Sequence, residues 1–137
     1  MTDAAPLVKT IEATVPAVGA ASTTQDQVVG EAPFAGTVTS VSITPEANLT
    51  AHASNYRTFA LVNKGAAGSG STTIATFATD TVTTDDLTAF DEKAIPLSAT
   101  AANLVVAAGD QLVIVETVAA SGVQHSGYHV AVEITRS

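Results

Sequence analysis

The sequence contains no cysteine and no tryptophan, and basic residues are scarce. Without cysteine the chain can form neither a disulfide framework nor a thiolate metal site. Five Lys and Arg residues stand against 13 Asp and Glu residues, which gives a formal charge of −8. This charge repels phosphate backbones and anionic lipid, and the five bases form no patch along the sequence. We therefore expect neither a nucleic-acid partner nor a membrane partner.

Long apolar runs are also missing. No stretch approaches the roughly 18 apolar residues of a membrane span. The beginning, MTDAAPLVKTIEATV, does not follow the pattern of a secretory signal peptide. The length of 137 residues suits one domain, which we expect to be soluble.

Recognisable catalytic and metal-binding patterns are missing as well. The glycine-rich residues 65–70 lack the Lys-Ser/Thr pair of a phosphate loop. His125 and His129 are four apart, but on a strand this spacing separates them by about 13 Å. The acids of residues 80–92 do not follow a calcium-loop pattern. We expect a protein that is not an enzyme and has no catalytic, cofactor or metal site.

Thr, Val and Ala are abundant, and Thr and Val favour strands because their branched Cβ suits a pleated sheet. Alternating apolar and polar residues predict about seven or eight strands and no helix. The fold class is therefore all-β: a jelly-roll-like or related antiparallel β-sandwich, with the immunoglobulin-like order left open. The predicted strands cover residues 27–31, 37–43, 56–63, 72–79, 94–99, 111–118 and 128–135, and residues 101–108 are a strand or a helical turn.

Two of these predictions concern the arrangement of the strands. Residues 56–63 and 72–79 form a hairpin with an exposed tip at 64–71, and Arg57 shares a face with Phe59 and Leu61. Residues 111–118 are apolar on both faces, so this strand should be the most central. In the last strand the inward residues should be Tyr128, Val130, Val132 and Ile134.

The N-terminal residues differ in composition from the rest. We predict an N-terminal arm over residues 1–25, with one strand-like stretch between Pro6 and Pro16, and a β-sandwich domain over residues 26–137. The small, polar VGAASTTQDQ reads as a hinge. The alternative is a disordered tail. The arm is favoured because a disordered tail rarely keeps apolar residues at this density, and its docking residues would be Leu7, Val8, Ile11 and Val15.

Residues 27–137 resemble small structural proteins of tailed bacteriophages, namely capsid decoration (cement) or head-fibre proteins. The similar segments are EAPFAGTVTSVSITPEANLT, NYRTFALVNKG, DEKAIPLSATAANLVVAAGDQLVIVET and the closing HVAVEIT. They are structural segments and contain no active-site residues. The predicted arm has no counterpart in this resemblance.

The resemblance implies a protein of the virion, on the capsid exterior, made in the cytoplasm of the host bacterium. It implies a homotrimer whose partner is the major capsid protein, and which bridges capsid subunits and so stabilises the assembled head. The four docking residues of the arm would then be capsid contacts. The alternative is a receptor- or glycan-binding module of a phage head or tail fibre, and a third reading is a bacterial pilus or surface-layer subunit.

Overall fold

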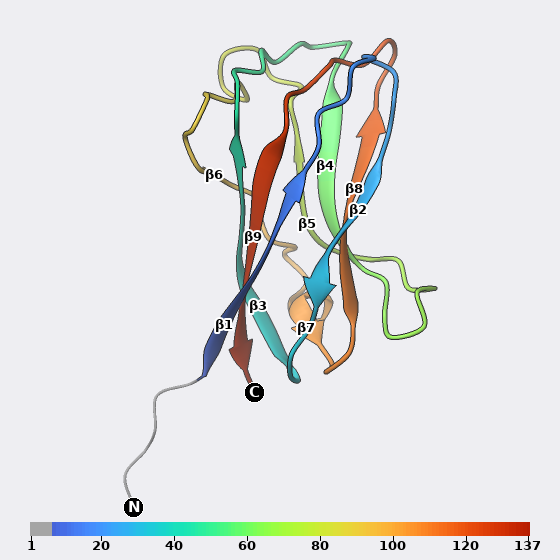
Figure 1. Cartoon of the computed structure of the whole chain (residues 1–137), viewed down its shortest axis with the longest axis vertical. Coiled ribbons are helices and arrows are strands. Elements are labelled where there is room, and N and C mark those ends of the chain that lie inside the picture. The colour runs from blue at the N-terminus through green and yellow to red at the C-terminus, as the bar shows by residue number, and fades with distance from the viewer. Residues whose placement is uncertain (1–6) are drawn as a thin grey trace, which may run out of the picture.

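Two antiparallel β-sheets pack face to face in the computed structural model, which describes residues 7–137 (Figure 1). All regular elements are strands except one short 3-10 helix. In chain order they are β1 (Val8–Val15), β2 (Asp26–Glu31), β3 (Gly36–Pro45), β4 (Arg57–Asn63), β5 (Thr72–Ala78), β6 (Lys93–Ala94), η1 (Ala101–Leu104), β7 (Val105–Val106), β8 (Gln111–Val118) and β9 (Tyr128–Arg136).

The strand order is that of a jelly roll. The first sheet has the order β1-β9-β3-β6, with the two-residue β7 also paired to β3, and the second sheet has the order β2-β8-β4-β5. With β7 set aside, the eight strands form two interleaved four-stranded sheets, which is the double Greek key of a jelly roll. The all-β sandwich is confirmed, and the strand order selects the jelly roll over the immunoglobulin-like alternative.

Strand alternation builds the core as the sequence predicts. The four inward residues named for the last strand are all buried, at 0–2% exposure. The predicted hairpin is β4–β5, paired from Thr58 to Asn63, and β8 lies between β2 and β4. The segment left open at residues 101–108 contains both a helical turn, η1, and a short strand, β7.

The predicted division into an arm and a sandwich is wrong for the described part of the arm. β1 pairs with β9 along its whole length, from Val8 opposite Thr135 to Val15 opposite Tyr128. Val15 is fully buried and Ile11 packs against the core. The alternation that suggested a strand is the inward face of an edge strand, so β1 belongs to the sandwich. Residues 1–6 of the predicted arm lie outside the described residues.

Four connections meet at one end of the sandwich, at the top of Figure 1. They are the loops β1–β2, β3–β4, β5–β6 and β8–β9, which the jelly-roll order brings together although they are far apart in sequence. The β4–β5 loop lies away from this end. The four gathered loops surround the most polar part of the interior, which is described next.

Replacing Val15 tests whether β1 is part of the fold. Val15→Ala should lower the free energy of unfolding by about 2 kcal/mol, because it leaves a cavity in a fully buried position. Thr14→Ser, on the outward face of the same strand, should change it by less than about 0.5 kcal/mol. Urea unfolding measures both values. Equal stability of the Val15→Ala variant and the wild type would contradict the placement of β1 in the core.

Candidate functional site

Arg57 is fully buried at the start of β4, where it points inward among the four loops. Its guanidinium group donates to the carbonyl oxygens of Ala21 and Thr23 in the β1–β2 loop at 3.0 and 2.7 Å. It also donates twice to the carbonyl oxygen of Val123 in the β8–β9 loop, at 3.0 and 2.8 Å. The fifth hydrogen bond goes to Glu116 at 3.0 Å. All five N–H donors of the arginine are therefore used.

Glu116 is the partner that balances this charge. It lies on β8 directly opposite Phe59 of β4 and is 1% exposed. Its Oε1 accepts hydrogen bonds from Arg57 and His125, and its Oε2 accepts from Tyr128 at 2.6 Å and from Gln25 at 3.2 Å. Burying a carboxylate is costly unless it is paired and hydrogen-bonded, and here four donors reach it.

An aromatic cluster encloses this ion pair. The rings of Phe59, His125 and Tyr128 meet edge to face, with centroids 5.2–5.9 Å apart. Both ring nitrogens of His125 face oxygen atoms: Nδ1 lies 2.6 Å from the carbonyl oxygen of Ser126, and Nε2 lies 2.8 Å from Glu116. Each ring nitrogen therefore has an oxygen acceptor within hydrogen-bond distance.

These surroundings shift two pKa values. Burial alone would raise the pKa of Glu116, but the hydrogen bonds from His125 and Tyr128, together with the charge of His125, hold that pKa below its ordinary value of 4.5. Burial raises the pKa of Tyr128 well above its ordinary value of 10, and the neighbouring Glu116 charge raises it further. At neutral pH the pair is a carboxylate that accepts from a neutral phenol.

We call Gln25, Arg57, Glu116, His125 and Tyr128 the ionic hub. Among residues 7–137 no buried side-chain nitrogen or oxygen lacks a hydrogen-bond partner. Each buried polar atom of the hub therefore already has a hydrogen-bond partner within the protein. The effect of the hub is structural, because it ties the β1–β2 and β8–β9 loops to the centre of the second sheet.

The residues predicted as capsid contacts divide into two pairs. Leu7 and Val8 are 51% and 47% exposed, so both are accessible at the beginning of β1. The prediction is wrong for Val15, which is fully buried opposite Tyr128 of β9, whereas Ile11, opposite Val132, is partly buried and packs against the core. The Val15 side chain has no surface to offer a partner, and Ile11 offers only part of its side chain.

The histidines do not come together. His125 belongs to the hub, His129 lies on the outer face of the first sheet 3.4 Å from Glu12, and His52 accepts two backbone hydrogen bonds within its own loop. Among residues 7–137 no group of three or more His, Asp or Glu side chains has an arrangement that could hold a metal ion. The same residues include no helix with the length and hydropathy needed to cross a membrane.

The outer faces of the two sheets differ in charge. The first sheet presents Glu12, His129 and Glu133 among Thr and Ser residues. On the second sheet only the edge strand β2 presents charges, Asp26 and Glu31. The outward positions of its other three strands are uncharged: Thr58, Ala60, Val62, Thr73, Thr76, Ala78, Gln111, Val113, Val115 and Thr117. We call this surface the neutral face.

A groove of about 300 Å³ borders the neutral face at its β5 edge. The segment that follows β6 forms its other wall, since Thr76 donates its backbone N–H to Pro96 and Ser98 donates to Ile74. The lining is mainly apolar and includes Ala75, Pro96, Leu97 and Ala99, together with the polar Thr73, Thr76, Ser98 and Asn103.

The ionic hub was not predicted, although the sequence contains a signal for it. The predicted alternation already placed Arg57 and Tyr128 inward, and Glu116 lies within the apolar QLVIVETV. Two opposite charges at inward positions of central strands must pair to be buried. The partners Gln25 and His125 could not be predicted in the same way, because they come from loops.

Comparison with known proteins adds little to this description. No protein-family model matches the chain, and no curated protein matches it. Two solved structures, of infectious bursal disease virus strains Gx and Gt, align with TM-scores of 0.42 and 0.37 at 14% and 17% identity. They cover 94% and 96% of this chain, which spans about a third of the viral chains, 32% in each case. The fold assignment rests on the strand order given above.

Removing the Glu116 charge tests the hub. Glu116→Gln should lower the free energy of unfolding by about 3 kcal/mol at pH 7, because Arg57 then keeps a buried charge without its counter-ion. The lowered pKa of Glu116 means that its stabilisation is present above pH 4.5 and is lost as the pH falls through the lowered value. Urea unfolding from pH 7 down to pH 3 should therefore show the wild type and the variant converging.

The matched control is Glu133→Gln on the outer face, which should change stability by less than about 0.5 kcal/mol at pH 7. A difference between the wild type and Glu116→Gln that stays constant down to pH 3 would contradict the assignment of an ionised Glu116.

Proposed function

We propose that the protein is a capsid decoration protein that binds the outer surface of an assembled phage head and stabilises it by bridging subunits of the major capsid protein. A ligand that binds only the assembled lattice stabilises that lattice by its binding free energy. A copy that contacts two or three subunits at once gains further through multivalency. Within this proposal the protein is a non-catalytic homotrimer.

The observation that carries the proposal is the neutral face. It is a sheet surface of small Val, Ala and Thr residues without a charged side chain, in a molecule with a formal charge of −8, and most of these residues are at least partly exposed although Val62 and Val113 are buried. A flat surface without charged groups can be buried against another protein at little desolvation cost, since few charges lose their water. The phage-like sequence segments supply the identity of that other protein.

The rigidity of the sandwich supports the same role. The hub fixes two of the four gathered loops with four hydrogen bonds from one arginine. The β3–β4 and β5–β6 loops are joined by two backbone hydrogen bonds between Leu49 and Leu87, each 2.9 Å long. A preorganised block loses little conformational entropy when it binds, which suits a protein that stiffens a lattice.

The glycan-binding alternative has less support. Sugar sites commonly stack an aromatic ring on the apolar face of the sugar. The groove beside β5 is lined by small aliphatic and hydroxyl side chains without an aromatic ring. We therefore keep the capsid as the proposed partner and make cell binding an outcome of the experiment.

The test is binding to expanded heads that lack the protein. Purified protein is added to the heads, the particles are sedimented, and the bound copies per major capsid subunit are counted. The proposal predicts saturation at a fixed lattice ratio and a higher temperature of head disruption. Absence of binding to heads, together with binding to host cells or cell-wall glycans, would refute the proposal.

Two matched alanine variants identify the bound face. Ala60 is central on the neutral face, and Ala131 is central on the outer face of the first sheet. Ala60→Lys should weaken head binding at least tenfold, because the contact would have to bury a new charge. Ala131→Lys should leave it unchanged. The opposite result would move the contact to the first sheet, next to the exposed Leu7 and Val8.

A further inference from the structure

Phe90, in the β5–β6 loop, is the most exposed large hydrophobic side chain among residues 7–137. It is 79% exposed, whereas the others with high exposure lie between 47% and 57%. Its φ angle is +62°, in the left-handed region that bulky side chains rarely adopt. The chain thus holds an aromatic ring in water on a strained backbone, and strain of this kind persists only where the surrounding structure enforces it.

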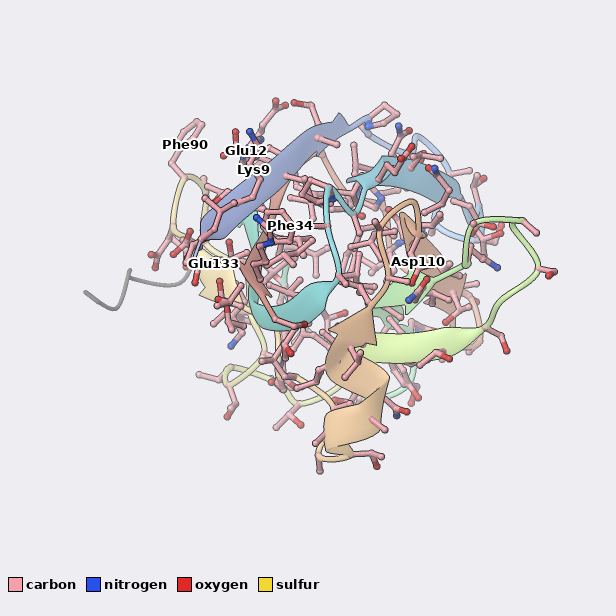
Figure 2. The ribbon with its side chains drawn as sticks, turned by 90° about the horizontal axis from the view of Figure 1, so that it is seen from below. Lys9, Glu12, Phe34, Phe90, Asp110 and Glu133 are labelled. Atoms are coloured by element: carbon pink, nitrogen blue, oxygen red, sulfur yellow. The ribbon has the colours of Figure 1, made fainter. Side chains whose placement is uncertain are left out.

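The surrounding loop does enforce it. The backbone N–H of Phe90 donates to the carbonyl oxygen of Pro45 at 2.8 Å. The preceding Ala89 donates to the side chain of Asn48, and the following Glu92 accepts from Ser42 on β3. Hydrogen bonds on both sides therefore fix the ring in its projecting position (Figure 2). A rigid exposed aromatic ring is a typical anchor of a protein interface, because little entropy is lost when it is buried.

The groove beside β5 is a suitable site for such a ring. Its volume is about 300 Å³, and a cavity of about 150 Å³ already holds benzene. Ala75, Pro96, Leu97 and Ala99 give it an apolar lining. The same chain therefore carries both an apolar projection and an apolar groove.

Charge favours a second copy of this chain at the groove. The projecting ring is followed by Asp91 and Glu92, so it is repelled by acidic surfaces, which predominate on a molecule of formal charge −8. The two segments that form the groove lie within residues 65–79 and 94–109, and neither segment contains a charged residue. Phe90 can thus approach the groove of another copy without like-charge repulsion.

We propose that Phe90 of one copy inserts into the groove between β5 and the residue 96–103 segment of the next copy. In Figure 2, Phe90 projects from one side of the molecule and η1, which contributes Asn103 to the groove, lies on another. Because projection and groove lie on different sides, we take the contact to be heterologous, and three copies related by a threefold axis would close it into the proposed trimer. This inference rests on the homotrimer of the proposed function and assigns its interface.

The first test is the oligomeric state of Phe90→Ala. Sedimentation equilibrium should show a closed trimer for the wild type, and a concentration for half-association that is at least tenfold higher for the variant. Val82→Ala is the matched control, since Val82 is 57% exposed in the same loop, and it should remain trimeric. At a concentration where both proteins are monomeric, the melting temperature of Phe90→Gly should not fall below that of the wild type, because glycine relieves the positive φ angle.

The second test uses the absence of cysteine from the chain. Asp91→Cys and Ser98→Cys place one thiol beside the projection and one at the groove. Mixed and oxidised, the two variants should form a disulfide-linked dimer that contains one chain of each. Asp91→Cys alone and Ser98→Cys alone should remain without cross-links, since a heterologous contact does not bring identical positions together.

Several results would overturn the inference: a monomeric wild type, a twofold dimer that cross-links through Asp91→Cys alone, or a Phe90→Ala variant that remains trimeric. A trimeric Phe90→Ala variant that fails to bind heads would assign Phe90 to the capsid contact instead. If the wild-type protein forms a trimer that depends on Phe90 but does not bind heads, the inference stands and the decoration function fails.

Discussion

The fold of this protein depends on one buried ion pair, Arg57 with Glu116. Each partner sits inward on a central strand of the second sheet, where either charge alone would be severely destabilising. The pair is stable there because its remaining capacity is filled by Gln25, His125, Tyr128 and three loop carbonyl groups. As a result, two loops about one hundred residues apart in sequence are held in one place.

Alternation and composition predicted most of the fold, because an apolar face must be buried whatever its neighbours are. The hairpin, the central β8 and the inward residues of β9 follow from that rule. The assignment of β1 to a separate arm was wrong because the small, polar segment after it has the composition of a hinge. In the structure, carbonyl groups of that segment accept hydrogen bonds from Arg57. Local composition cannot reveal an acceptor whose donor comes from a distant strand.

The candidate contact surfaces were harder to predict than the core. Of the four residues predicted as capsid contacts, Leu7 and Val8 are exposed, Ile11 packs partly buried against the core and Val15 lies within it. Phe90 carried no signal in the sequence, since its exposure depends on a positive φ angle that the β3–β4 loop enforces. The neutral face and the groove likewise emerge only when the jelly-roll order places β4, β5 and β8 side by side. The proposed assembly uses all three: the projection and the groove between copies, and the neutral face toward the capsid.

The central claim is that Arg57 and Glu116 stabilise the fold as a coupled pair. A double-mutant cycle with Arg57→Met, Glu116→Gln and the double variant measures that coupling directly through the free energies of unfolding. We predict that the double variant is more stable than the sum of the two single losses implies, by about 2 kcal/mol or more, since each single variant leaves one charged or polar group buried without its partner. Additivity within about 0.5 kcal/mol would show that the two residues act independently and would contradict this account.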